Sequence, residues 1–252
     1  MKTGMQRSAG IGGRGWPRST NAPADKARQR QRIEAALQFN REPILELNDI
    51  SHLLYEAREV SLSARVGMSL STALGKSVDM TRWLDRLVMN GAIEVLRANP
   101  SVELGCAING ESATDDAWWG SVFQLLEQEP DVARRLVVEL AETALLDPAA
   151  GRAFFWRLRW CGCRIAIKEF GVRYGVQSEM AVRDPDFIKL DPTLLCAAHQ
   201  SGRGERRLAQ LLKLASESAP CVIVDGVETN RDAALANDVG AKWAQFRYLQ
   251  DA

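Results

Sequence analysis

The amino-acid sequence predicts an α/β protein with the architecture of a TIM-like (β/α)₈ barrel. Three observations support this fold class. Apolar runs of strand length recur eight times, segments with helical periodicity separate most of them, and Gly or Pro stands just before several strands. A barrel of this type needs about 250 residues, and the chain has 252. An open doubly wound sheet produces the same alternation, so periodicity alone leaves it as the alternative.

The predicted strands are short runs rich in Val, Ile and Leu. They lie at residues 43–47, 53–62, 102–109, 136–140, 163–167, 186–190, 221–224 and 242–246. The clearest helix is 80–98, where apolar side chains such as Met80, Trp83, Leu84 and Leu87 follow the spacing of one helix face. Similar periodicity predicts helices at 116–129, 145–160, 205–218 and 230–238.

The composition is that of an ordinary soluble protein, with 46% hydrophobic and 25% charged residues. It excludes a disordered chain, a fibre and a disulfide-rich miniprotein. No apolar stretch approaches the roughly 18 residues of a membrane helix, so we expect no membrane span. The five cysteines form no C-x-x-C pair, which indicates reduced thiols and a cytoplasmic location. The chain has only two histidines, which argues against a His-based zinc site or a Ser-His-Asp hydrolase.

The net charge of zero conceals an uneven distribution. Residues 1–32 contain eight basic side chains and one acidic one. Few apolar residues accompany them at the start, so we expect a flexible basic tail over 1–28, followed by the barrel domain over 29–252. Because the remainder of the chain is acidic, we do not expect specific nucleic-acid binding.

Polar side chains occupy the ends of the predicted strands, where barrel enzymes place their functional residues. Glu139, Asp225 and Gln245 lie late in their strands, and Lys189 follows the same pattern. Buried carboxylates are costly unless they are paired or bind a cation. Several carboxylates at one barrel mouth therefore indicate a site for Mg²⁺, Mn²⁺ or phosphate.

The order and spacing of these residues resemble the EAL domain, the cyclic di-GMP phosphodiesterase family, over about residues 30–249. Intervals of 21, 36 and 20 residues separate Lys168, Lys189, Asp225 and Gln245, and they match the family pattern. The corresponding motifs are Glu42-Pro43-Ile44, Glu56-Ala57-Arg58, Ala107-Ile108-Asn109, Glu139-Leu140-Ala141-Glu142, Lys168-Glu169-Phe170-Gly171, Lys189-Leu190-Asp191, Asp225-Gly226-Val227-Glu228 and Gln245-Phe246-Arg247.

The resemblance implies a role for each motif residue. In the family, two divalent cations bind the scissile phosphate and lower the pKa of the attacking water, and a lysine helps to position that water. By resemblance, the metal ligands would be Glu56, Asn109, Glu139 and Asp225. The catalytic positions would be Lys189 and Glu169. Possible nucleotide contacts would come from Glu42, Arg58, Asp191 and Gln245.

Several positions depart from the family pattern. Lys168 replaces an aspartate that bridges the metals, and a cation cannot ligate a cation. Glu169 is one methylene longer than the family residue, and Glu42 replaces a glutamine that contacts the nucleotide. We therefore expect a degenerate metal centre with no cofactor, or Mg²⁺ or Mn²⁺ if any metal is retained. We also expect the closing C-terminal helix of the family to be short or absent.

These departures favour a non-hydrolysing regulator in cyclic di-GMP-related signalling that works by contacting a regulatory protein partner. A metal-independent cyclic di-GMP receptor is the first alternative, and a residual phosphodiesterase is the second. Homodimer formation stays open. A contact patch could come from the aromatic residues Trp118, Trp119, Phe154, Phe155, Trp156 and Trp160, although aromatics at helical spacing usually pack in the core.

Overall fold

The computed structural model describes residues 22–141, 147–172 and 182–247, and the chain divides into two compact units after Ala36. The described part of the first unit contains helix α1 (Ala22–Glu34). Residues 22–28 are therefore helical, whereas the composition predicted a flexible tail as far as residue 28. Ala, Lys, Arg and Gln are strong helix formers, which accounts for the difference. The rest of the predicted tail, residues 1–21, lies outside the described residues.

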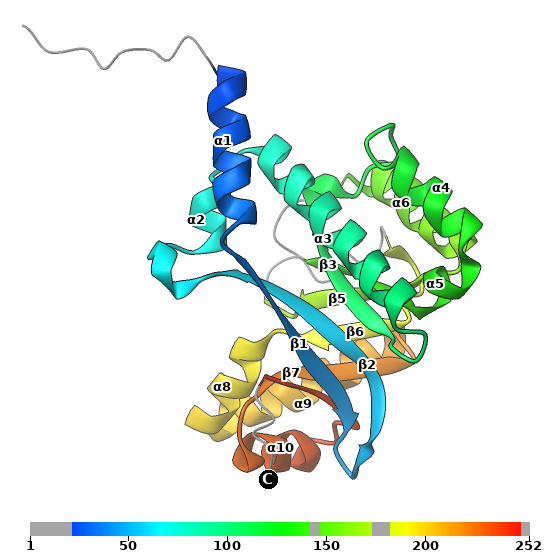
Figure 1. Ribbon diagram of the computed structural model, residues 1–252. Helices are drawn as coiled ribbons and strands as arrows, with labels where there is room; N and C mark the ends of the chain where they lie inside the picture. Colours follow the sequence, from blue (N-terminus) through cyan, green and yellow to red (C-terminus); the bar gives the residue numbers. More distant parts are fainter. Residues whose placement is uncertain (1–21, 142–146, 173–181, 248–252) are drawn as a thin grey trace, which may run out of the picture. The chain divides into compact units, whose positions relative to one another are not determined.

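The second unit is a closed barrel whose strands follow one another in sequence order (Figure 1). Each of the predicted strands is present, with boundaries that differ by a few residues. The strands are β1 (Leu37–Glu46), β2 (Asp49–Leu62), β3 (Leu104–Asn109), β4 (Leu136–Ala141), β5 (Arg164–Phe170), β6 (Phe187–Leu190), β7 (Cys221–Val227) and β8 (Trp243–Phe246). The barrel is confirmed and the open-sheet alternative is excluded.

Strand β1 runs antiparallel to both of its neighbours, β2 and β8, whereas the other adjacent pairs are parallel. The reason is the connection between β1 and β2, which consists only of Leu47 and Asn48. Such a short link can close a hairpin, but a parallel pair needs a crossover of a dozen or more residues. The hairpin also makes β1 and β2 the longest strands, at 10 and 14 residues.

The helices of the second unit lie outside its strands (Figure 1). Five of them match the predictions: α3 (Val78–Ala98), α4 (Gly120–Gln128), α6 (Pro148–Cys161), α9 (Gly202–Ser218) and α10 (Asn230–Asp238). The helices α2 (Leu70–Leu74), α5 (Pro130–Arg135) and α8 (Pro192–Gln200) were not predicted. With 5 and 6 residues, α2 and α5 are too short to show a clear period. The expectation for a closing C-terminal helix concerns residues beyond 247, which lie outside the described part of the chain.

The candidate aromatic patch divides into a buried part and an exposed part. Trp119, Phe154 and Phe155 are buried and pack edge to face or tilted against one another. Trp156 and Trp160 are 64% and 74% exposed on α6, and their rings stack with centroids 5.6 Å apart. Trp118 is half-buried against Arg82 and Arg86, so the stacked pair is the most exposed part of the predicted patch.

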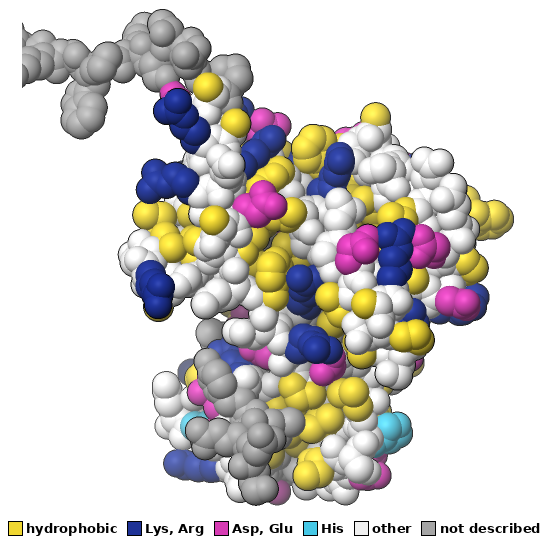
Figure 2. Space-filling model, viewed as in Figure 1, with side chains coloured by type: hydrophobic (Ala, Val, Ile, Leu, Met, Phe, Trp, Pro, Cys, Tyr) yellow, Lys and Arg dark blue, Asp and Glu magenta, His cyan; other side chains and the backbone are white. Residues whose placement is uncertain are grey.

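The described helices include none that combines the length and the apolar character needed to cross a bilayer. Charged side chains of both signs are interspersed with hydrophobic ones on the face that Figure 2 shows.

Candidate functional site

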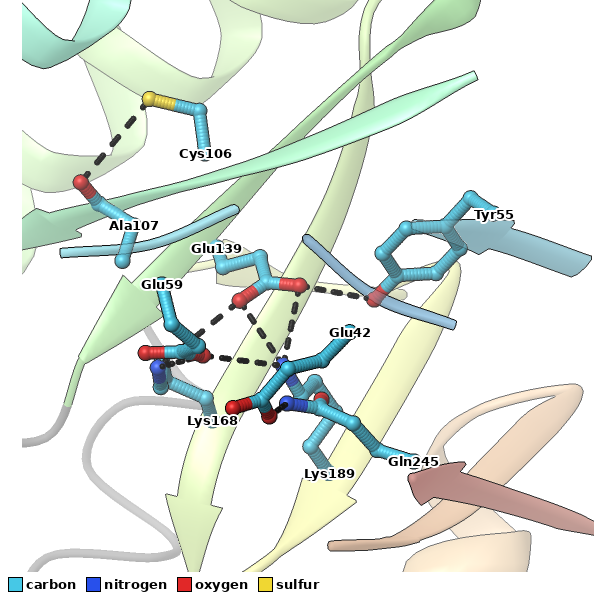
Figure 3. Close-up of polar contacts among 9 residues, drawn as sticks. All are labelled: Glu42, Tyr55, Glu59, Cys106, Ala107, Glu139, Lys168, Lys189 and Gln245. Carbon is cyan, nitrogen blue, oxygen red and sulfur yellow. Dashed lines mark hydrogen bonds and ion pairs between the residues drawn. The ribbon is translucent and has the colours of Figure 1, made fainter. Parts of the chain in front are cut away.

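Two lysines and two glutamates form a compact cluster at the carboxyl ends of the barrel strands (Figure 3). Lys189 Nζ lies 2.9 and 3.0 Å from the two oxygens of Glu139, and Lys168 Nζ lies 2.9 Å from Glu59 Oε1. Cross-pairings of 4.0 Å link Lys168 to Glu139 and Lys189 to Glu59. We call Glu59, Glu139, Lys168 and Lys189 the ion-pair quartet.

The strands place the quartet in the barrel interior, next to a layer of close-packed side chains. Lys189 and Glu139 are 0% and 1% exposed. Tyr55 adds a hydrogen bond, because its hydroxyl donates to Glu139 Oε1 at 3.0 Å. Gly105 on β3 leaves room for this arrangement, since a Cβ there would lie 2.6 Å from Glu139 Oε1 and 2.7 Å from the Tyr55 ring. A glycine is therefore required beside the buried carboxylate.

The charges of the quartet stabilise one another. Burial alone would raise the pKa of Glu59, but attraction to Lys168 and Lys189 outweighs it and lowers that pKa to about 2. Burial alone would lower the pKa of Lys168, but attraction to Glu59, Glu139 and Asp225 raises it above its ordinary value. The Lys168–Glu59 pair therefore stays charged at neutral pH.

The lowered pKa of Glu59 predicts a specific loss of stability in acid. The pKa falls from 4.5 to about 2 on folding, so the contribution of Glu59 is complete above about pH 4.5 and disappears as the pH falls towards 2. At neutral pH, Glu59→Gln should cost about 3–5 kcal/mol, because it removes the partner at 2.9 Å and leaves the buried Lys168 with only the 4.0 Å contact to Glu139. Urea denaturation from pH 7 to pH 2 should show this cost shrinking between pH 4.5 and 2.

A matched control comes from the same strand. Glu56→Gln removes a carboxylate whose partner, Arg41, is half exposed, so its cost should be at most about 1 kcal/mol at neutral pH. A difference between wild type and Glu59→Gln that stays constant down to pH 2 would contradict the assignment.

Strand β2 does not contribute the glutamate that the motif comparison selected. Glu56 is not part of the quartet, and its Oε2 lies 2.9 Å from Arg41 Nη1. Side chains alternate between the two faces of a strand. Because Tyr55 and Ala57 belong to the buried core, Glu59 shares their face and Glu56 does not. The prediction of Glu56 as a metal ligand is therefore wrong, and sequence reasoning missed Glu59. Glu59 lies an even number of residues from Tyr55 and Ala57, and this spacing could have identified it as an interior residue.

Arg58 also lies away from the site. Its guanidinium covers the Phe39 ring at 4.0 Å from the centroid, and a Cβ on Gly91 of α3 would lie 3.0 Å from its Nη1. Arg58 therefore packs beneath α3 on the outer face of the barrel. Side chains alternate between the two faces of β2, and Arg58 takes the outer face. The prediction of Arg58 as a nucleotide contact is therefore wrong.

Asn109 ends β3, where the motif comparison predicted a metal ligand, and Asp85 of α3 holds it there. The backbone N–H and side-chain amide of Asn109 donate to the Asp85 carboxylate at 3.0 and 2.9 Å. Ser112 Oγ is a further donor to the same carboxylate. Burial raises the pKa of Asp85 to about 6 even though these hydrogen bonds oppose the shift. Asp85 was not predicted, because it lies within a helical segment without a motif.

A cavity of about 430 Å³ opens beside the quartet, and we call it the mouth cavity. Gln245 Nε2 donates to Glu42 Oε2 across its wall at 2.6 Å. Burial raises the pKa of Glu42, and it raises the pKa of Asp225 although Lys189 and Lys168 attract that carboxylate. Further lining comes from Glu169, whose φ of 63° lies in the left-handed region, and from Asp191, which caps α8 by accepting from Thr193 N.

The described donor set does not fit a two-metal centre. The oxygens of Glu139 accept from Lys189, and Glu59 accepts from Lys168, so ammonium groups occupy the space between these carboxylates. Among the described residues, no group of three or more His, Cys, Asp and Glu side chains is arranged to hold a metal ion. Of the predicted ligands, Glu139 lies in the quartet and Asp225 lines the mouth cavity, whereas Glu56 lies elsewhere.

Comparison with known proteins identifies the family. A family model of the EAL domain matches residues 50–251. The chain belongs to the EAL domain family.

Curated relatives of this EAL domain include two cyclic di-GMP phosphodiesterases. TpdA of Vibrio parahaemolyticus is 27% identical over 178 residues, which cover 64% of this chain and 30% of TpdA. RocR of Pseudomonas aeruginosa is 27% identical over 111 residues, which cover 44% of this chain and 28% of RocR. The match therefore spans less than a third of the length of each of these relatives.

Solved structures share the fold of this EAL domain. The manganese and cyclic di-GMP complex of Klebsiella pneumoniae BlrP1 has a TM-score of 0.67 and 20% identity, covering 84% of this chain and 55% of BlrP1. The apo S helix-GGDEF-EAL structure of Vibrio cholerae LapD has a TM-score of 0.71 and 17% identity, covering 88% of this chain and 55% of that one.

Proposed function

We propose that this EAL domain is a non-hydrolysing regulator in cyclic di-GMP-related signalling that acts by binding another protein. The observation that carries the proposal is the position of Lys168, whose ammonium lies 2.9 Å from Glu59 and 4.0 Å from Glu139. Like charges about 4 Å apart repel by about 4 kcal/mol at an effective dielectric constant of 20, and a divalent cation doubles that figure. Lys168 therefore opposes the metal binding on which hydrolysis would depend.

Two further observations bear on the proposal: an exposed aromatic pair supports protein binding, and free thiols support a cytoplasmic location. The stacked pair Trp156 and Trp160 presents aromatic surface to solvent on α6, and Trp is enriched in protein interfaces. The cysteines are free thiols, as is typical of a cytoplasmic protein. The partner in this proposal is a regulatory protein, with a second copy of the chain as an alternative.

Metal-independent binding of cyclic di-GMP is the second candidate function, and the volume of the mouth cavity favours it. About 430 Å³ of space persists at the barrel mouth, with Gln245 and Asp191 in its lining. BlrP1, which shares the fold, is described as a complex with manganese and cyclic di-GMP. A receptor needs this space but not the metal chemistry.

One experiment separates these functions. The purified chain is incubated with labelled cyclic di-GMP, with and without Mg²⁺ or Mn²⁺, and both retained ligand and linear product are measured. We expect no linear product under any condition, because Lys168 keeps its place between the carboxylates. TpdA of Vibrio parahaemolyticus, which is named as a cyclic di-GMP phosphodiesterase, serves as the positive control.

Binding without hydrolysis in this assay would identify the receptor, and absence of both would leave the protein-binding regulator. Metal-dependent turnover near the enzyme median of about 10 s⁻¹ would contradict the proposal and establish a phosphodiesterase.

A further inference from the structure

Two residues that line the mouth cavity carry buried oxygen atoms with no hydrogen-bond partner among the described residues. They are Asp225 Oδ1 and Gln245 Oε1, on residues that are 5% and 1% exposed. Both residues line the cavity. Buried polar atoms in native proteins nearly always have partners. Because both atoms are acceptors, the group that satisfies them must be a hydrogen-bond donor.

The orientation of the Gln245 amide is set by its neighbour Glu42 (Figure 3). Gln245 Nε2 donates to Glu42 Oε2 at 2.6 Å, and a flipped amide would place its oxygen against that carboxylate instead. The nitrogen is therefore committed to Glu42, and the oxygen is the atom left for another donor. The contact with Glu42 therefore fixes Gln245 Oε1 as the acceptor that lacks a partner.

The charge of the cavity favours a cation. Its lining includes five acidic side chains, Glu42, Glu59, Glu169, Asp191 and Asp225, and two basic ones, Lys168 and Arg247. Lys168 is paired with Glu59, and Arg247 lies 3.4 Å from Glu228. An excess of carboxylates on concave walls concentrates positively charged ligands.

We propose that the mouth cavity binds one organic cation of the guanidinium or ammonium class, held by Asp225 Oδ1 and Gln245 Oε1. A guanidinium presents several N–H donors in a plane and is more weakly hydrated than an ammonium, so it suits a confined site that offers two acceptors. A divalent metal fits less well, because among the described residues no group of three or more His, Cys, Asp and Glu side chains is arranged to hold one, and the Lys168 ammonium is part of the lining.

Two sources share this chemistry, namely an arginine or lysine side chain of a protein partner and a small free guanidine or polyamine. Cation binding is measured by calorimetry, and hydrolysis of cyclic di-GMP is measured by the linear product, so each proposal has its own readout. The two proposals can therefore fail independently.

Calorimetric titration of the purified chain tests the inference. The probes are acetyl-arginine amide, its neutral analogue acetyl-citrulline amide, agmatine and a pentapeptide with a central arginine. We expect the arginine probe to bind at least about tenfold more tightly than the citrulline probe, because the two have nearly the same shape but differ in charge. Tighter binding of the pentapeptide would support a protein source, and tighter binding of agmatine would support a small-molecule source. Mg²⁺ at matched ionic strength should not compete.

Substitutions locate the site. Asp225→Asn keeps the shape of the side chain and should weaken the arginine probe about tenfold or more. Glu217→Gln makes the same change of charge at an exposed position on α9, and it should leave the affinity unchanged. Equal binding of the arginine and citrulline probes, or an unaltered affinity in Asp225→Asn, would overturn the proposal.

Amide hydrogen exchange of the wild type provides a second measurement that does not depend on the folding of a variant. The arginine probe should increase protection in β7 and β8, which carry Asp225 and Gln245. Protection confined to other elements would overturn the assignment of the site.

Discussion

Replacing Lys189 by Met should destabilise the barrel by about 3–5 kcal/mol, because the change leaves a buried carboxylate without its cation. Lys189 is fully buried, and its ammonium contacts both oxygens of Glu139 at 2.9–3.0 Å. Methionine has a similar length and is apolar, so the loss would come from the charge rather than from an empty space. Urea denaturation should show this loss, and thermal melting should show a fall of roughly 10 °C.

Two controls separate the buried charge from a general effect of losing a lysine. Lys242→Met removes a cation that is 61% exposed, so it should cost less than about 1 kcal/mol. The double variant Lys189→Met, Glu139→Gln removes both charges and should recover much of the stability lost in Lys189→Met. A double variant whose loss equals or exceeds the sum of the two single losses would show that the pair is not the source.

Replacing Lys168 by Asp should make the stability of the barrel depend on divalent cations. The side chain of Lys168 is 8% exposed and lies against Glu59 and Glu139. An aspartate at this position would add a third carboxylate and leave Lys189 as the neighbouring cation. We expect the variant to be weakened without metal, because buried like charges repel one another.

Bound metal should reverse that loss. Mass action supplies about 2.7 kcal/mol when the metal concentration is 100 times the dissociation constant, which corresponds to a rise of several degrees in melting temperature. Melting curves with EDTA, Mg²⁺ and Mn²⁺ should show this rise in Lys168→Asp and little change in the wild type. Restored hydrolysis is not expected, because Glu56 remains outside the cluster and Glu42 remains acidic.

Matched variants identify the reason for any response to metal. Lys168→Met removes the positive charge without adding a ligand, and it should respond to metal much less than Lys168→Asp. Lys213→Asp makes the same change of charge at an exposed position on α9, and it should respond as the wild type does. Equal metal-induced shifts in the wild type and Lys168→Asp would show that Lys168 does not keep cations out of the site.

Most of the barrel could be predicted from the sequence because its signals are local. The eight apolar runs correspond to β1 to β8, and the periodic segment 80–98 corresponds to α3. The motif residues Lys168, Lys189 and Glu139 also come together, because the carboxyl ends of parallel strands meet at one mouth. Helix α5 was missed because its 6 residues are too short to show a period.

The sequence alone thus determined which strands form and which of their ends carry charge. The tertiary structure decided which charges meet, because pairing depends on the face that each side chain takes. In β2, the interior positions of Tyr55 and Ala57 place Glu59 in the quartet, while Glu56 and Arg58 take the opposite face. The position of Lys168 depended on the same long-range packing, since its partner Glu59 lies 109 residues away in the chain. Closure of the barrel brings the two side chains together.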